Sequence, residues 1–231
     1  MLARVRGDLR TILDSFPDGA ESEMNTPLST ANSMTAFDWT DLRDRLRGTS
    51  VYLVGMMGAG KSTLGRLLAK ELGYGFVDTD AAIEKVAGKS IPDIFAESQE
   101  AGFRALESQV LAELSQFPRL VVATGGGIVV RKRNWGELRN GLVVWLDVPA
   151  EVLHQRLAAD DTPRPLLETP DPVATLNALL EQRRSLYAQA DVCIRSDRQS
   201  PVELLPQLGY QILQTLQLNP PESAKSRSTD P

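Results

Sequence analysis

A glycine-rich octapeptide, Gly55–Ser62, constrains the fold of this 231-residue chain more than any other segment. Its residues, Gly-Met-Met-Gly-Ala-Gly-Lys-Ser, match the pattern G-x-x-x-x-G-K-[ST], in which successive backbone N–H groups point at phosphate oxygens. The aliphatic run Val51–Val54 precedes it, and a helical leucine stripe that starts at Lys61 and stops at Gly73 follows it. A strand, a glycine loop and a helix in this order predict a site for a nucleoside triphosphate, with a plain tight turn as the weaker alternative.

Short β-branched and aliphatic runs recur along the chain and alternate with helical stretches. Because these runs are continuous rather than alternating in polarity, they are typical of strands buried on both faces of a parallel sheet. The sequence therefore predicts a doubly wound α/β fold, and it places the single cysteine, Cys193, as a buried strand residue. The predicted strands are Val51–Val54, Phe76–Asp78, Leu120–Thr124, Leu142–Val148 and Val192–Ile194.

The two ends of the chain differ from this pattern. Residues 1–48 contain only short apolar stretches, and we interpret them as an N-terminal extension that is largely disordered, with Met24 or Met34 as alternative starts. Within the extension, a short amphipathic helix around Trp39–Arg47 is expected to cover the first strand. Residues 218–231 are polar and proline-bearing, and we expect them to form a disordered tail.

The net charge and the cysteine and histidine content of the chain exclude several classes of partner and site. The chain has a formal net charge of −5 and a pI near 5.1, which argues against a nucleic-acid partner, since such proteins present basic surfaces to phosphates. With one cysteine and one histidine, the chain cannot form an internal disulfide, a Cys/His metal cluster is disfavoured, and a cytoplasmic location fits. No apolar run approaches the ~20 residues of a membrane span. Catalysis must therefore rest on Lys, Arg, Asp, Glu and backbone groups.

Two carboxylates follow the second predicted strand, in the sequence Asp78-Thr79-Asp80. Ligands of open α/β sheets bind at the carboxyl ends of the strands, and side chains two residues apart on a strand point the same way. We therefore expect one carboxylate to serve a metal ion and the other to meet the hydroxyl of an acceptor. The alternative is that Asp80 is the N-cap of the next helix.

A glycine triplet and three arginines complete the candidate residues. Gly125-Gly126-Gly127 follows the third predicted strand, where the missing side chains let a ligand lie against the backbone, although a plain turn is equally compatible. Arg104, Arg164 and Arg183 are each compatible with a solvated surface position. Together, on an acidic chain, they favour an anion-binding set. Arg164 also lies within Asp160–Pro172, a stretch with four prolines that is typical of a mobile loop.

Several motifs occur in a fixed order: Gly55–Thr63, Asp78-Thr79-Asp80, Ile91–Phe95 leading into Phe103-Arg104 and Glu107, Gly125–Gly127, Arg164–Leu167, Arg183 with Leu186-Tyr187, and Gln199-Ser200-Pro201. This series resembles the shikimate kinase family from about Val51 to about Leu216. Two departures stand out. Ser185 replaces a proline of many relatives, and the extra cation at Arg184 leaves open which arginine points inward. Gln99-Glu100 replaces Gly-Glu, a change that is expected to affect a loop.

The resemblance implies a P-loop kinase domain over residues 49–217, with a fold similar to that of nucleoside monophosphate kinases. It implies a five-stranded parallel sheet of order 2-3-1-4-5 and a lid loop at about 158–172. The implied reaction transfers the γ-phosphoryl group of ATP to the 3-hydroxyl of shikimate, with Mg²⁺ as cofactor, in the chorismate pathway to aromatic amino acids. The partners are then ATP and shikimate, with no nucleic acid and no membrane, and we expect a cytoplasmic monomer.

Matched residue by residue, the resemblance also implies roles. Lys61, Asp80 and Arg164 would carry catalysis, with Arg164 reaching the phosphates from the lid. Ser62 would bind the metal ion directly, and Asp78 would bind it through water. The adenine would lie beside Arg198–Pro201. The implied ATP contacts are Gly58, Ala59, Gly60, Lys61, Ser62, Thr63, Arg164 and Gln199, and the implied shikimate contacts are Asp80, Arg104, Gly126, Gly127 and Arg183.

Two rival interpretations stay open. A gluconate or nucleotide kinase would share the P-loop, and it would be favoured if the arginines served a sugar or a phosphate. A non-catalytic module that binds nucleotide or substrate belongs to a different class. Lys61, Asp80 and Arg164 together disfavour it, because a binding module does not need the groups that act in transfer.

Overall fold

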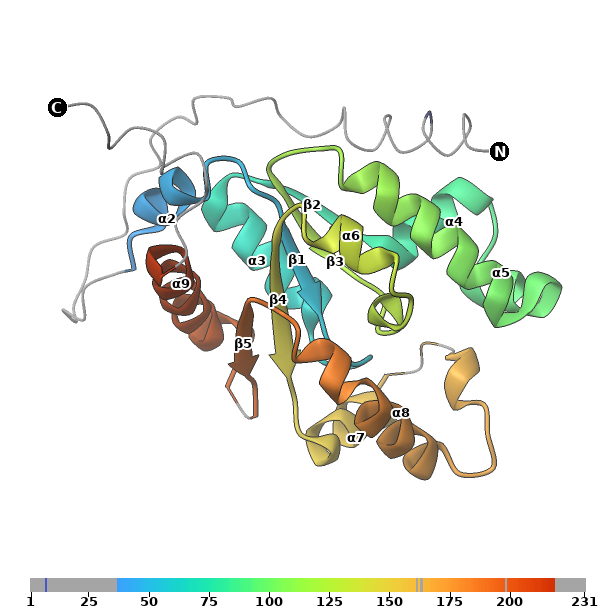
Figure 1. Cartoon of the computed structure of the whole chain (residues 1–231). Helices are drawn as coiled ribbons and strands as arrows, with labels where there is room; N and C mark the ends of the chain where they lie inside the picture. The colour runs from blue at the N-terminus through green and yellow to red at the C-terminus, as the bar shows by residue number, and fades with distance from the viewer. Residues whose placement is uncertain (1–6, 8–36, 161, 163, 198, 219–231) are drawn as a thin grey trace, which may run out of the picture.

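The computed structural model describes residues 7, 37–160, 162, 164–197 and 199–218. Within them a parallel sheet runs in the order β2-β3-β1-β4-β5, as the resemblance implies (Figure 1). Each strand begins and ends within one residue of its predicted range, so the aliphatic runs alone located the strands. The strands are β1 (Val51–Val54), β2 (Gly75–Asp78), β3 (Leu120–Ala123), β4 (Leu142–Asp147) and β5 (Val192–Arg195).

Helices cover both faces of the sheet, which confirms the doubly wound class (Figure 1). One face carries α2 (Trp39–Leu46), α3 (Lys61–Leu72) and α9 (Pro201–Leu218). The other face carries α4 (Thr79–Ala87), α5 (Ile91–Leu114), η1 (Ile128–Val130) and α6 (Asn134–Leu138). Beyond the carboxyl ends of the strands lie α7 (Ala150–Ala158), η2 (Pro165–Leu167) and α8 (Pro172–Tyr187). No helix in the described part of the chain is long and apolar enough to cross a bilayer.

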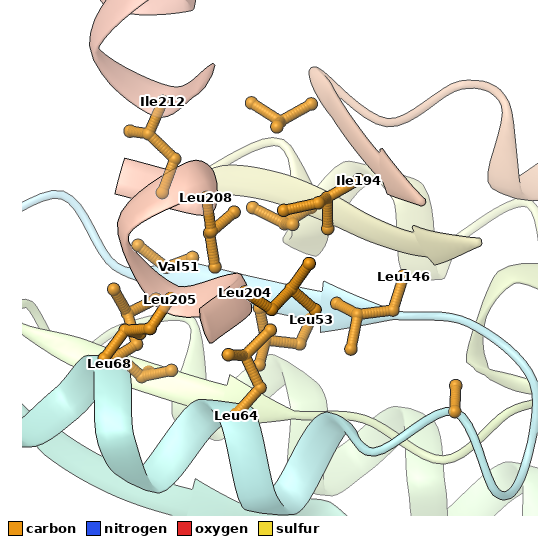
Figure 2. Close-up of a cluster of buried hydrophobic side chains, with 14 of the residues drawn as sticks. Val51, Leu53, Leu64, Leu68, Leu146, Ile194, Leu204, Leu205, Leu208 and Ile212 are labelled. Carbon is orange, nitrogen blue, oxygen red and sulfur yellow. The ribbon is translucent and has the colours of Figure 1, made fainter. Parts of the chain in front are cut away.

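The first core forms between the sheet and the helices α3 and α9. Figure 2 shows leucines of α9 packed over Leu53 of β1 and against Leu64 and Leu68 of α3. Burial of such aliphatic side chains contributes roughly 1.5–3 kcal/mol each. This core fixes α3, and therefore the phosphate-binding end of α3, against the sheet.

Leu208→Ala tests the contribution of α9 to this core. Leu208 is 0% exposed, and its removal should lower the free energy of unfolding by about 2–5 kcal/mol, because a cavity is left among rigid neighbours. Urea unfolding measures this loss. Val202→Ala on the same helix is the control, because Val202 is 68% exposed and its loss should change stability by no more than about 0.5 kcal/mol. Similar effects of both substitutions would contradict the packing described.

The predicted helix near Trp39 is present as α2, and it packs mainly against α3 and α9. Asp38 caps its N-terminus, and its buried residues Leu42 and Leu46 belong to the first core. Packed structure therefore begins before the expected boundary at residue 49. At the other end, α9 continues to Leu218. The rest of the predicted extension, residues 1–6 and 8–36, and the predicted tail, residues 219–231, lie outside the described residues.

The prediction that Cys193 is buried is wrong. On β5, Val192 and Ile194 face the first core, whereas Cys193 and Arg195 are exposed. The reason is that β5 lies at the edge of the sheet, where the helices of the second face do not reach. A short aliphatic run does not distinguish an edge strand from a central one.

Candidate active site

The loop between β1 and α3 adopts a conformation that only glycine adopts readily. Gly55, Gly58 and Gly60 have φ values of 144°, 77° and 93°. A Cβ atom at Gly55 would also lie 2.7 Å from the backbone oxygen of Leu146 on the neighbouring strand β4. Gly60 is the N-cap of α3. The backbone N–H groups of the loop therefore lie next to the N-terminus of this helix, which carries a partial positive charge. The local geometry is therefore that of an anion-binding loop.

Lys61 is buried at the start of α3 and folds back over this loop. Its Nζ donates to the backbone oxygens of Gly55, at 2.9 Å, and Met56, at 2.8 Å. Burial lowers the pKa of Lys61 to about 8, while the carboxylates of Asp80 and Asp78 act in the opposite direction. The ammonium group therefore stays largely protonated at neutral pH, next to the cavity in front of the loop.

Asp78 is the last residue of β2 and also the N-cap of α4. Its Oδ1 accepts from the backbone N–H groups of Asp80, at 3.0 Å, and Ala81, at 3.4 Å, and its Oδ2 accepts from the Ser62 hydroxyl at 2.5 Å. The idea that Asp80 caps the helix is therefore wrong, because Asp78 does. The expectation that both carboxylates project from the strand is also wrong, because Asp80 lies in the first turn of α4.

Asp80 nevertheless faces the same cavity as Asp78. Its Oδ1 is buried and has no hydrogen-bond partner within the described residues. Burial, and then the charge of Asp78, raise the pKa of Asp80 to about 6, although Lys61 and Arg104 favour its ionised form. A buried carboxylate with an unused oxygen in a cavity is a candidate proton acceptor or hydroxyl ligand.

Two cavities of about 450 Å³ each meet at Asp80. The first lies in front of the glycine loop, and it is lined by every residue that the resemblance assigned to ATP. The second lies beside α5, and it is lined by every residue assigned to shikimate. Met57, Asp80, Gly125, Gly126 and Arg164 line both cavities. The two cavities are therefore adjacent, and Asp80 lies in the wall of both.

Arg104 is buried in the wall of the second cavity. Its Nη1 donates to both carboxylate oxygens of Glu107 at 3.0 Å, and its Nη2 donates to Glu100 at 3.2 Å. Gly127 lies directly against the guanidinium group, so a Cβ atom there would collide with it. Glu107 is fully buried, and burial raises its pKa to about 7 in spite of the opposing effect of Arg104. The glycine triplet thus forms a turn, in which the Ile128 N–H donates to the Gly125 oxygen at 3.1 Å, and this turn also makes room for a cation.

Arg183, not Arg184, points inward from α8. Arg183 is only 3% exposed, and its Nη1 donates to the backbone oxygen of Gly126 at 3.3 Å. Arg184 is exposed and pairs with Glu181 at 3.3 Å and Asp147 at 3.7 Å. Helix phase therefore settles the choice that Ser185 and Arg184 left open in the sequence.

Phe95 and Phe103 give the second cavity an aromatic wall, and the Arg104 guanidinium lies 5.1 Å from the Phe103 ring centroid. Gln99 has a φ of 57° and a ψ of −174°, so α5 bends there, and Gln99 lies at the kink between two helical segments. The ring centroids of Phe95 and Phe103 lie 4.8 Å apart across this bend. In a straight helix, eight residues would separate them by about 12 Å along the axis. The bend therefore creates the apolar side of the cavity.

Arg164 lies at the mouth of both cavities, where its Nη2 donates to Asp160 at 2.5 Å. It belongs to the predicted lid, of which residues 161 and 163 lie outside the described residues. Gln199 is exposed at the edge of the first cavity. Its neighbour Arg198, also part of the proposed adenine segment, lies outside the described residues.

A sequence model of the shikimate kinase family matches residues 57–217 of this chain. The chain belongs to the shikimate kinase family. It is 59% identical over 174 residues to a shikimate kinase of Parasynechococcus marenigrum, across 72% of this chain and 91% of that protein. It is 53% identical over 173 residues to one of Nostoc sp., across 74% and 92%. A solved shikimate kinase from Acinetobacter baumannii in complex with shikimate is 40% identical, with a TM-score of 0.69 over 78% of this chain and 98% of that one.

The shikimate kinase site also contains residues that sequence reasoning did not assign. Arg156 of α7 donates to the backbone oxygens of Gly58, at 3.3 Å, and Ala59, at 3.1 Å, at the rim of the first cavity. The sequence analysis named Glu107 within a motif and gave it no role. Its spacing of three residues from Arg104 nevertheless predicts an ion pair on one face of a helix. No comparable local signal marks Arg156, because its contact joins residues almost one hundred positions apart.

Proposed function

We propose that this member of the shikimate kinase family transfers the γ-phosphoryl group of ATP to the 3-hydroxyl of shikimate, giving shikimate 3-phosphate and ADP in aromatic amino-acid biosynthesis. The observation that carries the proposal is the meeting of two cavities at one buried carboxylate, Asp80. One cavity has a phosphate-binding loop and the other has two buried arginines suited to an organic anion. The relative from Acinetobacter baumannii, solved in complex with shikimate, is consistent with that anion.

In the first cavity, the loop from Gly55 to Gly60 would hold the β- and γ-phosphates through its N–H groups. Lys61 would leave the carbonyl oxygens of Gly55 and Met56 and donate to phosphate oxygens instead. Arg164 would add a second cation from the lid side. Gln199 lies at the cavity edge, where the adenine would be placed.

The residues in this cavity also fit Mg²⁺. Ser62 and Asp78 present a hydroxyl and a carboxylate 2.5 Å apart at the wall of the cavity. Mg²⁺ is bound by few protein oxygens together with water and substrate phosphates, so this pair is sufficient. In the proposal Ser62 binds the ion directly and Asp78 binds it through water, and the bound ion would neutralise charge on the phosphates.

In the second cavity, Arg104 and Arg183 would bind the carboxylate of shikimate. Gly126 and Gly127 would lie near its ring, because both line this cavity and neither carries a side chain of its own. The 3-hydroxyl would then face Asp80, whose pKa of about 6 leaves the carboxylate mostly ionised at neutral pH. Asp80 would orient this hydroxyl and accept its proton as the phosphoryl group is transferred.

Closure of the lid gives a prediction that is independent of turnover. Glu168 is exposed after η2, so a glutamate-specific protease should cut after it in the free protein. Mg·ADP and shikimate together should slow this cleavage several-fold, because a closed lid holds Arg164 over the phosphates. Mass spectrometry of the fragments measures the rate. Equal rates with and without both ligands would contradict a lid at residues 158–172.

A panel of acceptors with labelled ATP tests the proposed function. Shikimate should be phosphorylated, whereas gluconate and nucleoside monophosphates should give no product above the acceptor-free control, because neither matches a cavity that has both a carboxylate clamp and an aromatic wall. Equal transfer to gluconate would contradict the proposed acceptor.

We further propose a monomer, since one chain encloses both cavities, and a cytoplasmic location, which the single cysteine favours.

A further inference from the structure

Tyr187, at the end of α8, is fully buried beside the acceptor cavity without lining it. Its ring stacks on Trp145 of β4, with centroids 5.9 Å apart and an interplanar angle of 23°. Its hydroxyl donates to the backbone oxygen of Gly126 at 2.5 Å and lies 3.8 Å from Sδ of Met56. The ring is therefore fixed by packing, and the hydroxyl is directed at one glycine of the triplet.

The same two acceptors also meet Arg183, one turn earlier on α8. Nη1 of Arg183 donates to the Gly126 oxygen at 3.3 Å and lies 4.0 Å from Sδ of Met56. The buried Nε of Arg183 has no partner among the described residues. Tyr187 and Arg183 thus share one carbonyl oxygen and one sulfur, so the hydroxyl of the first restricts where the guanidinium of the second can lie.

Met56 and Gly126 connect this cluster to the phosphate-binding loop. The backbone oxygen of Met56 accepts from Lys61 at 2.8 Å, while its sulfur faces α8. A Cβ atom at Gly126 would lie 3.2 Å from the Met57 nitrogen, so the backbone of the triplet rests on the loop itself. Groups from the nucleotide side and the acceptor side therefore meet around the Tyr187 hydroxyl.

We propose that Tyr187 is a positioning residue for the acceptor: its hydroxyl, through Gly126 and Met56, fixes Arg183 and the glycine triplet relative to the phosphate-binding loop. The proposal rests on the proposed function for the identity of the acceptor. Without the hydroxyl, the long bond from Arg183 is the one side-chain hydrogen bond that the Gly126 oxygen keeps within the described part of the chain. The guanidinium then shifts toward that oxygen and away from the carboxylate that it should bind.

Tyr187→Phe tests this role by removing a single oxygen atom. Shikimate should bind roughly 3- to 10-fold more weakly, the effect of one buried hydrogen bond, while a non-hydrolysable ATP analogue binds as before. Calorimetry measures both affinities. Tyr52→Phe is the matched control, because Tyr52 is as deeply buried on β1 but lines neither cavity, and it should leave both affinities unchanged. Met56→Leu, which removes the sulfur and leaves Tyr187 in place, should weaken shikimate about 2-fold, as expected for a weak acceptor.

Hydrogen exchange separates this proposal from the proposed function. Backbone amides in the segment 125–130 should exchange several-fold faster in Tyr187→Phe than in the wild type or in Tyr52→Phe, because the triplet loses a fixed contact. If wild-type protein bound no shikimate, the proposed acceptor would be wrong, and this exchange rate alone would decide the role of Tyr187. Unchanged exchange, or unchanged shikimate affinity in a variant of a wild type that binds shikimate, overturns the proposal.

Discussion

Asp80→Asn is expected to lower kcat for shikimate phosphorylation by at least about 10²-fold while ATP still binds. Asparagine keeps the size and the cavity position of the side chain but cannot accept the hydroxyl proton. Asp80 has the required features: a buried oxygen without a hydrogen-bond partner among the described residues, a place between the two cavities, and a pKa that burial raises to about 6. Steady-state kinetics at saturating ATP and shikimate measure kcat, and calorimetry measures ATP affinity.

Asp44→Asn is the control for this experiment, because Asp44 is an exposed carboxylate on α2 that lines neither cavity. It should leave kcat unchanged. If Asp80→Asn retained near-normal turnover, Asp80 would have no part in the chemistry. Its buried oxygen would then need another explanation.

Arg104→Ala is expected to weaken shikimate by about 30-fold to several thousand-fold, with a much smaller effect on ATP. The estimate corresponds to about 2–5 kcal/mol for removing one partner of a buried, hydrogen-bonded charge pair. Arg104 lines only the acceptor cavity, which gives the expected difference between the two ligands. Calorimetric titration with each ligand measures this difference directly.

The substitution also leaves Glu107 buried without its guanidinium partner, so the unfolding transition must be measured alongside binding. Arg184→Ala is the matched control, because Arg184 is an exposed arginine that pairs with Glu181 and Asp147 and lines neither cavity. An equal loss of shikimate and ATP affinity in Arg104→Ala would indicate a folding defect and contradict a role in binding the acceptor.

Much of the fold could be predicted because its signals are local. The aliphatic runs located all the strands of the sheet, and the octapeptide at Gly55 fixed the loop, the start of α3 and Lys61. The sheet order was not a local signal, and it came from the resemblance to a family. Cys193 was misplaced because the edge position of β5 depends on strands far away in the sequence.

The sequence predicted which residues form the candidate site better than it predicted how their side chains are placed. The alternative that Asp80 caps the next helix was wrong, because β2 ends at Asp78 and α4 begins at Thr79, a boundary that no residue pattern marked. The choice between Arg183 and Arg184 depended on the rotation of α8 about its axis, which packing determines. Tyr187 and Arg156 act on groups far away in the chain, so their contacts appear only once the helices are placed on the sheet.

The most direct test of the proposed reaction is to incubate purified, folded protein with Mg·ATP and shikimate and to quantify both products. The proposed geometry predicts one ADP and one shikimate 3-phosphate for each phosphoryl group transferred, and almost no ADP when shikimate is omitted. Protein that unfolds cooperatively, binds ATP, and still leaves shikimate unphosphorylated would contradict the assignment of the two cavities.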